Sequence, residues 1–177
     1  GVIRRIISEF EDIGYSCRAE LLNSADFGSY QRRVRCFILG SSHGEAPQFP
    51  PPTHTRNPEL GLKPWKSLGE FLEKFEDLEE ENYTFPTKEA ATKLAKVSDG
   101  SGLKSRGKKE HTRPGGHWGY RQGMFIADQS LPARTVTGTS SQDWVRRNGV
   151  LRRLTLQEVK VLQGFPTDWE FKGNKTQ

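Results

Sequence analysis

The stretch that decides the fold is Asn23-Ser24-Ala25-Asp26-Phe27-Gly28-Ser29-Tyr30-Gln31-Arg32-Arg33-Val34-Arg35, which leads into Cys36-Phe37-Ile38-Leu39-Gly40. Its first part is rich in turn residues and its last part is mostly apolar, so it predicts a connector that feeds a buried strand. Arg33 and Arg35 are two residues apart, so on a strand both side chains point to the same face. Two guanidinium groups on one face can bind a phosphate, or a carbonyl that gains negative charge. Taken alone, the pattern is better explained as a solvated strand edge.

The residues before this stretch predict a helix and a strand. Apolar residues recur at helical spacing from Val2 to Ile13, and Gly14 is a typical helix end. Ser16 to Leu22 is typical of a strand, so residues 1–41 have α/β character. Gly1 to Arg5 lacks the pattern of a signal peptide and is typical of a helix interior, which predicts that the chain is part of a longer protein.

The two cysteines, Cys17 and Cys36, both fall in the predicted strands. Neither belongs to a Cys-x-x-Cys pair, which excludes a zinc finger. Since their neighbours are apolar, we expect both to pack as small buried side chains.

The composition changes beyond residue 42. Residues 43–58 contain five prolines and predict a domain boundary or an extended crossing segment. Helices are predicted at Ser67–Leu78, which opens on a capping-box pattern, and at Thr87–Val97. Phe125–Thr137 alternates enough to predict one or two strands.

Residues 98–123 are rich in glycine and in basic residues. For the lysine run within them, an exposed surface loop is the better interpretation. For Arg113–Gln122 we favour a nucleic-acid contact, because Arg and Gln side chains make paired hydrogen bonds to purine edges and glycine lets the backbone approach its partner. The residues that we predict to contact DNA in this loop are Arg113, Trp118, Tyr120, Arg121 and Gln122.

Two further motifs lie near the C-terminal end. Pro132-Ala133-Arg134-Thr135-Val136-Thr137 places a guanidinium next to a hydroxyl, which suits a phosphate contact. Arg152-Arg153-Leu154-Thr155-Leu156-Gln157-Glu158 predicts a short helix that opens on a capping box and stops at Gln163-Gly164-Phe165-Pro166. Taken alone, the first motif is weak and the second is structural.

The charge balance favours a polyanionic partner. The formal net charge is +5, with 33% hydrophobic and 28% charged residues. Nucleic acid is the first candidate and an anionic membrane surface the second, while a soluble protein with extra lysines explains the charge equally well. No run of apolar residues is long enough to predict a transmembrane helix.

In this combination and order, the motifs resemble those of the cytosine-C5 DNA methyltransferases. That family carries Leu-Asn-Ala, Tyr/Phe-Gly and Gln-x-Arg-x-Arg elements, then a variable target-recognition region with a Pro-x-x-Thr element, and then Arg-x-x-Thr-x-x-Glu-x-x-x-Leu-Gln-Gly-Phe-Pro. The resemblance anchors residues 1–41 and 126–171, whereas residues 42–125 fall where the family varies. Ser29-Tyr30 departs from the valine-proline that the family commonly has there.

The resemblance implies an α/β fold with a partial Rossmann-like methyltransferase catalytic domain plus an irregular α+β target-recognition domain. Residues 1–41 would form the C-terminal part of the S-adenosylmethionine-dependent catalytic domain. Residues 42–150 would form the target-recognition domain, and residues 151–177 a motif helix packing between the two.

The resemblance also implies roles for individual residues. In the family, a cysteine attacks C6 of a cytosine flipped out of the duplex, and C5 then takes the methyl group of S-adenosylmethionine. Arg35 would contact O2 of that cytosine and stabilise the developing charge, and Arg33 would order the catalytic loop or a nearby phosphate. Thr135, beside Arg134, would hold a phosphate next to the flipped nucleotide. The residues expected to have a structural role are Gln31, Arg152, Thr155 and Glu158.

Several motifs of the family are missing from the chain. No cysteine follows a proline, and neither Glu-Asn-Val nor a Phe-x-Gly-x-Gly cofactor loop is present. Gly100-Ser101-Gly102 follows no predicted strand and is a poor substitute. We therefore expect the chain alone to be inactive, with the main S-adenosylmethionine pocket outside it and no metal.

The expected partners are double-stranded DNA and the missing catalytic portion or a complementary subunit, with no membrane. The setting would be a restriction–modification system in the cytoplasm of a bacterial or phage-infected cell, at the nucleoid. Two alternatives remain open: a catalytically inactive, sequence-specific DNA-binding module, and a structural fragment without activity.

Overall fold

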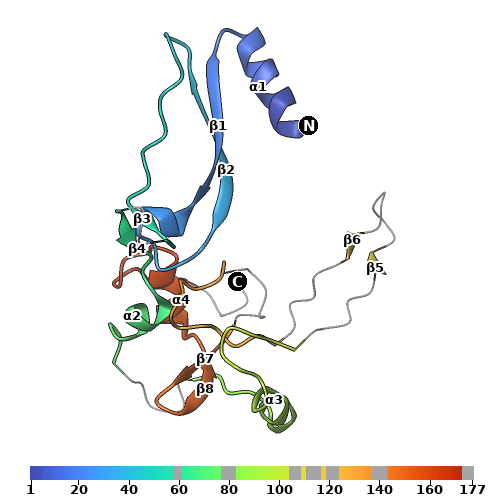
Figure 1. Ribbon diagram of the computed structural model, residues 1–177, viewed down its shortest axis with the longest axis vertical. Helices are drawn as coiled ribbons and strands as arrows, with labels where there is room; N and C mark the ends of the chain where they lie inside the picture. Colours follow the sequence, from blue (N-terminus) through green and yellow to red (C-terminus); the bar gives the residue numbers. More distant parts are fainter. Residues whose placement is uncertain are drawn as a thin grey trace. The chain divides into compact units, whose positions relative to one another are not determined.

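The chain divides into two units, Gly1–Trp65 and Lys66–Gln177, in the computed structural model shown in Figure 1. The structure describes residues 1–57, 61–76, 83–103, 109–110, 117–118, 124–136 and 143–172, with only the backbone described for 109–110 and 117–118. Each unit is considered by itself.

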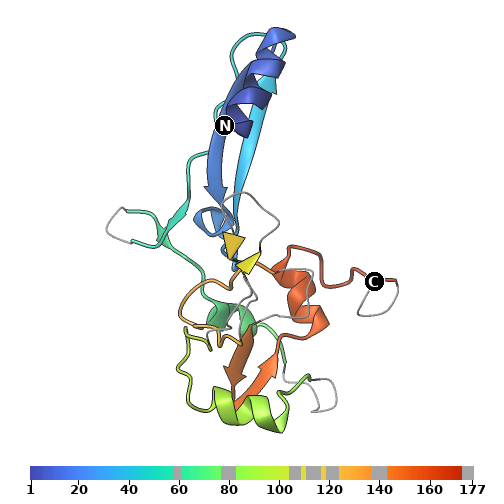
Figure 2. The same cartoon turned by 90° about the vertical axis from the view of Figure 1, so that its right-hand side faces the viewer.

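The first unit is organised around an antiparallel hairpin of β1 (Ser16–Asn23) and β2 (Val34–Ser41), accompanied by the helix α1 (Val2–Asp12) (Figure 2). The register pairs Ser16 with Ser41 and Asn23 with Val34. These elements confirm the helix and the two strands predicted from the sequence. A mixed α/β fold is consistent with the methyltransferase resemblance.

The turn-rich connector between the strands forms a short 3-10 helix, η1 (Ser24–Phe27). The Asn23 Oδ1 atom accepts hydrogen bonds from the backbone N–H groups of Ala25 (3.4 Å) and Arg33 (3.2 Å), which closes the connector at its base. Gly28 ends η1 with a φ of +84°, and a Cβ added there would lie 2.8 Å from the His54 ring. Only glycine satisfies both the left-handed backbone and this close approach.

The burial predicted for β2 and for the cysteines is wrong within the first unit. Val34 is 50% exposed and Phe37 47% exposed, Cys36 is exposed and Cys17 only half-buried. The physical reason is that a sheet of two strands has no second layer in the described part of this unit, and α1 buries none of its own residues.

The proline-rich segment after β2 belongs to the first unit. The short parallel strands β3 (His54–Thr55) and β4 (Lys63–Pro64) pair here. The Thr53 N–H donates to the Asp26 carbonyl oxygen (2.9 Å), and the Trp65 indole Nε1 donates to the Asp26 carboxylate (2.7 Å). The units thus divide after Trp65, whereas the functional domains were predicted to divide at residues 41 and 150; the functional assignment stays a prediction.

The second unit is built on a hairpin that the sequence analysis missed. β7 (Trp144–Arg147) and β8 (Val150–Arg153) pair through an Asn148-Gly149 turn whose φ angles, 51° and 77°, are both positive. An Asn-Gly pair is a strong signal for a two-residue hairpin turn of this type. Trp144 of β7 forms a buried cluster with Leu94 and Ile126.

The strands predicted over Phe125–Thr137 are reduced to isolated single bridges in the described residues. Phe125 pairs with Gly102 and Ile126 pairs with Trp144. Ala133 is a further bridge residue, and the other residues from Ala127 to Val136 belong to no helix or strand. A Cβ added at Gly102 would lie 2.7 Å from the Met124 carbonyl oxygen, so glycine allows the backbones to meet here.

The helices of the second unit begin where predicted; α2 and α3 end earlier than predicted, whereas α4 stops before Gln163-Gly164 as expected. They are α2 (Leu68–Leu72), α3 (Lys88–Leu94) and α4 (Leu156–Leu162), and a small antiparallel pair consists of β5 (Lys109–Glu110) and β6 (His117–Trp118). The capping boxes predicted at Ser67 and Thr155 are both confirmed. α2 was predicted to continue to Leu78, but the Arg147 guanidinium binds the carbonyl oxygens of Leu72 and Phe75 (2.6 Å each) just where the helix ends.

We expect Arg147→Ala to lower the free energy of unfolding by about 1.5–3 kcal/mol, the usual contribution of hydrogen bonds to a charged group. The substitution removes the guanidinium donor from the Leu72 and Phe75 carbonyl oxygens, of which Leu72 keeps the hydrogen bond from the Phe75 N–H. Urea unfolding followed by tryptophan fluorescence measures the change. Arg4→Ala on the exposed surface of α1 is the control; an equal effect of the two substitutions would contradict this role for Arg147.

Candidate functional site

The Gln-x-Arg-x-Arg segment of the first unit is anchored by its backbone and by Gln31. Gln31 is 3% exposed, its N–H donates to Ser29 Oγ (3.1 Å), and its carbonyl oxygen accepts from Ser24 Oγ (2.6 Å). The Arg33 N–H donates to Ser24 Oγ (3.1 Å). These hydrogen bonds fix the backbone immediately before β2. The connector therefore determines where the strand that carries the arginines begins.

The two predicted catalytic arginines are differently placed. Arg33 precedes β2 and is half-buried, whereas Arg35 lies within β2, opposite Leu22, and is exposed. The Arg35 Nη1 atom donates to the Val34 carbonyl oxygen (2.7 Å). Within the described ranges neither guanidinium forms an ion pair. Because a guanidinium has five N–H donors, Arg35 keeps donors that a carbonyl or phosphate oxygen could accept.

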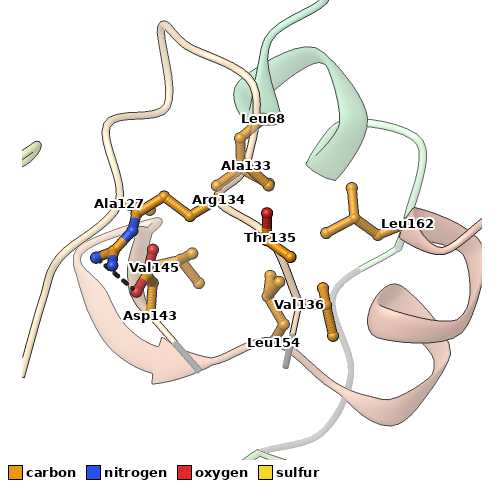
Figure 3. A pocket seen from close by; sticks show the side chains of 10 residues that line it. All are labelled: Leu68, Ala127, Ala133, Arg134, Thr135, Val136, Asp143, Val145, Leu154 and Leu162. Carbon is orange, nitrogen blue, oxygen red and sulfur yellow. Dashed lines mark hydrogen bonds and ion pairs between the residues drawn. The ribbon is translucent and has the colours of Figure 1, made fainter. Parts of the chain in front are cut away.

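In the second unit, the predicted phosphate-binding pair Arg134 and Thr135 lies at a narrow pocket (Figure 3). The Arg134 Nη1 atom lies 3.3 Å from the Asp143 Oδ1 atom, and its guanidinium carbon lies 4.3 Å from the centre of the Phe125 ring. The ion pair and the ring both restrict the guanidinium. The residues that line the pocket are Leu68, Ala127, Ala133, Arg134, Thr135, Val136, Asp143, Val145, Leu154 and Leu162.

Asp143 and Arg153 extend this site beyond the residues predicted from the sequence. Burial raises the pKa of the Asp143 carboxyl, and Arg134 and Arg153 partly oppose that shift. Burial likewise lowers the pKa of the Arg153 guanidinium, whose carbon lies 3.7 Å from the centre of the Trp144 ring. No spacing pattern signals these contacts, because a loop and a hairpin bring the residues together.

The raised pKa of Asp143 predicts a pH dependence of stability. Its carboxyl binds its proton more tightly in the folded chain than in the unfolded chain, for which the ordinary value is 3.8. Its contribution to the free energy of unfolding therefore falls as pH rises from that value through the raised pKa. Asp143→Asn should flatten this part of the profile in urea titrations at several pH values. An unchanged slope would show that Asp143 does not titrate with folding.

Arg152 and Glu158, predicted as structural residues, form a buried ion pair. Their side chains are 2% and 3% exposed, and both guanidinium Nη atoms lie 2.8 Å from a carboxylate oxygen. Glu158 Oε2 also accepts from the Thr155 N–H (2.7 Å), while Thr155 Oγ1 accepts from the Glu158 N–H (3.1 Å). The ring of Tyr83 covers the guanidinium at 4.4 Å. The three motif residues thus join β8 to the start of α4.

The predicted base-reading residues fall largely outside the described residues. Arg113, Tyr120, Arg121 and Gln122 lie there, and Trp118 belongs to β6 without a described side chain. Among the residues that the structure describes, no group of three His, Cys, Asp or Glu side chains could hold a metal ion. In the same part of the chain, no helix has the length and apolar character needed to cross a membrane.

Comparison with known proteins decides the family. The family profile described as "C-5 cytosine-specific DNA methylase" matches residues 1–177. The chain belongs to this family. As a C5 cytosine methylase it is similar to the Type II methyltransferase M.NgoFVII of Neisseria gonorrhoeae, at 29% identity over 99% of the chain and 47% of the relative.

Two further relatives give the same result. The Type II methyltransferase M1.HphI of Haemophilus parahaemolyticus is 29% identical over 96% of the chain and 44% of the relative. The Type II methyltransferase M.NgoBI of Neisseria gonorrhoeae is 30% identical over 94% of the chain and 45% of the relative. This C5 methylase chain therefore spans slightly less than half the length of these curated relatives.

Proposed function

We propose that this chain recognises double-stranded DNA and positions a flipped cytosine within a DNA (cytosine-5-)-methyltransferase. The observation that carries the proposal is the exposed Arg35 guanidinium, which follows a connector fixed by the buried Gln31, in a chain of the C5 methylase family. A cytosine must leave the base stack before its ring can be attacked, and it then needs donors that hold it outside the duplex.

Arg35 is the proposed catalytic residue of this chain. Attack on C6 moves negative charge toward the O2 side of the ring, and a guanidinium already in place stabilises that charge without reorganisation. Arg33 would order the adjoining loop or a phosphate, and Gln31 would hold the strand entry. The nucleophilic cysteine would come from outside this chain, because neither Cys17 nor Cys36 follows a proline.

Arg134 and Thr135 are the proposed phosphate contacts. A guanidinium restrained by Asp143 and Phe125, beside a threonine hydroxyl, supports this role because phosphate contacts set the position of a protein on the duplex. Arg113, Trp118, Tyr120, Arg121 and Gln122 are the proposed contacts to the bases.

The described residues do not fit the S-adenosylmethionine that this family uses. A nucleotide-type cofactor site needs a strand, a glycine turn and a helix in succession. In this chain Gly100 and Gly102 follow the helix α3 rather than a strand. The proposal therefore places methyl-donor binding in the remaining part of a complete enzyme, and no step depends on a donor site in this chain.

A reconstitution experiment tests the proposal. The chain is mixed with labelled S-adenosylmethionine, duplex DNA and the portion of M.NgoFVII, M1.HphI or M.NgoBI that lies outside its match to this chain. We expect methyl transfer in a mixture and none from either component alone. Methylation by this chain alone would refute the assignment of roles, and DNA binding without methylation in every mixture would favour an inactive DNA-binding module.

Two classes of substitution should separate base reading from phosphate binding. We expect Arg121→Ala or Gln122→Ala to relax base preference at a cost of about 1–3 kcal/mol on the preferred duplex. Arg134→Ala should instead weaken binding to all duplexes and lower the slope of log affinity against log salt by about 1. Binding titrations on preferred and random duplexes measure both effects; equal losses on both duplexes for every variant would contradict the division.

A further inference from the structure

The connector that precedes Arg33 and Arg35 is held by two sets of contacts. The first set is local: Asn23 Oδ1 and Ser24 Oγ accept hydrogen bonds from the Arg33 N–H (3.2 and 3.1 Å) and close the connector at its base. The second set comes from a segment that lies far along the chain, residues 53–57 and 61–65. No motif in the sequence marks this second set of contacts, because it depends on tertiary structure.

Asp26, in η1, is the residue on which the second set of contacts converges. Its carbonyl oxygen accepts a hydrogen bond from the Thr53 N–H (2.9 Å), and its carboxylate oxygen Oδ1 accepts one from the Trp65 indole Nε1 (2.7 Å). Beside it, the His54 ring lies so close to Gly28 that an added Cβ there would come within 2.8 Å of the ring. We call these three contacts the Asp26 clip.

The two donors that meet Asp26 belong to one hydrogen-bonded unit. Thr53 and Trp65 lie at the outer ends of the paired strands β3 and β4. The Lys63 N–H donates to the Thr53 carbonyl oxygen (3.3 Å), and the Trp65 N–H donates to the Thr55 carbonyl oxygen (2.9 Å). Asp26 and Trp65 are both half-buried, and a hydrogen bond to a carboxylate is stronger than one between neutral groups. The clip therefore restrains η1 with a preformed support.

The restraint reaches the arginines through the backbone of the connector. Gly28 ends η1, and only the short segment around Gln31 separates it from β2. A guanidinium stabilises a developing charge only if it is already in place, and a misplacement of about 1 Å can cost about 100-fold in rate. We propose that Asp26 and Trp65 are positioning residues, which fix the connector and thereby the place from which Arg35 meets the flipped cytosine. The inference rests on the proposed function and adds to it the residues that set this geometry.

Nuclear magnetic resonance on the free chain is the first test. The chain has four tryptophans, so nitrogen–proton correlation spectra contain four indole signals that can be followed separately. We expect the Trp65 indole N–H to exchange with water about tenfold or more slowly than that of Trp169, which is 52% exposed, because only the former binds a carboxylate. Asp26→Ala should remove this protection and shift the backbone amide signals of Arg33 and Val34.

The outcomes of this test are distinct. Equal exchange of the Trp65 and Trp169 indoles in the unmodified chain would overturn the inference, because the clip would then be open. An Asp26→Ala chain in which the Trp65 signal moves and the Arg33 and Val34 amides do not would also overturn it. The Trp144 indole signal belongs to the second unit and should stay in place, which shows that the substitution acts locally.

Methyl-transfer rates of the reconstituted mixture are the second test. Trp65→Phe keeps an aromatic ring and removes only the N–H donor, and it should slow single-turnover transfer at saturating DNA by about tenfold to 100-fold. Its affinity for duplex DNA should change by less than about twofold. Trp169→Phe is the matched control and should leave the rate unchanged. Asp26→Asn keeps an acceptor oxygen and should retain more of the rate than Asp26→Ala.

A double variant tests whether the two residues act through their shared hydrogen bond. In a chain that carries Asp26→Ala, Trp65→Phe should cause no further loss of rate, because the bond is already absent. Fully additive losses would overturn the clip. Circular dichroism confirms that each variant is folded; if Trp65→Phe loses the spectrum of the unmodified chain, Asp26→Ala, which leaves the indole ring in place, is compared with Trp169→Phe instead.

The remaining outcomes separate this inference from the proposed function. If Trp65→Phe lowers only the stability and the folded variant keeps the full rate, the clip is structural and the inference is overturned. If no mixture that contains the unmodified chain methylates DNA, the proposed function fails. The amide signals of Arg33 and Val34 in the Asp26→Ala chain then still decide whether the clip positions the connector.

Discussion

Glu158→Gln is expected to lower the free energy of unfolding of this chain by about 3–5 kcal/mol, the usual cost of removing one partner of a buried ion pair. Arg152 is 2% exposed and would keep its charge without the carboxylate that now meets both of its Nη atoms at 2.8 Å. The Tyr83 ring and the Arg153 carbonyl oxygen remain in contact with the guanidinium, but neither carries a compensating charge. Urea unfolding followed by tryptophan fluorescence measures the loss.

A double variant distinguishes the charge effect from the loss of helix capping. Arg152→Met combined with Glu158→Gln removes both charges and should recover part of the loss, because replacing both members of a buried pair costs less than leaving one unpaired. Thr155→Ala removes the capping hydroxyl alone and should cost about 0.5–2 kcal/mol. A loss below about 1 kcal/mol for Glu158→Gln would mean that the pair behaves like one at the surface.

Arg35→Ala is expected to slow methyl transfer in the reconstituted enzyme by about 100- to 1,000-fold, the effect of removing one donor that stabilises a developing oxyanion. The reason is the proposed contact between its guanidinium and O2 of the flipped cytosine. Arg35→Lys should give an intermediate rate, because an ammonium keeps the charge and loses the planar fork. Single-turnover rates at saturating DNA measure the chemical step separately from binding.

Two observations would separate catalysis from folding or binding. Arg4→Ala, on the exposed surface of α1, should leave the rate unchanged, and the affinity of the Arg35→Ala variant for duplex DNA should change far less than its rate. If the rate loss is recovered entirely by raising the DNA concentration, Arg35 contributes to binding alone. That result would remove its catalytic role.

The elements that could be predicted are those whose signal is local. Helical spacing identified α1, and strand-like composition identified β1 and β2, although their pairing as a hairpin was not predicted. The capping boxes at Ser67 and Thr155 marked the first residues of α2 and α4, because a cap depends on residues three positions apart. The end of α2 was predicted wrongly, since Arg147, distant in sequence, binds the carbonyl oxygens of Leu72 at the helix end and of Phe75 just beyond it.

The residues of the candidate site likewise fall into those that a local motif identified and those that only the tertiary structure identified. Arg35, Arg134 and Thr135 could be named because they belong to short motifs with fixed spacing. Asp143, which pairs with Arg134, could not be named, because the two residues lie nine positions apart and no helix or strand periodicity predicts their contact. The β7–β8 hairpin itself was missed although its Asn148-Gly149 turn is a local signal.

By itself, the amino-acid sequence determined the family, the order of the motifs and the starts of the helices, because each depends on residues close together in the chain. Only the tertiary structure decided which charges are buried, as in the Arg152–Glu158 pair, and which apolar surfaces stay open, as at Leu21 and Val34. Burial depends on which distant segments cover a residue. The same apolar strand sequence is therefore compatible with a strand that a second layer buries and with one that solvent covers.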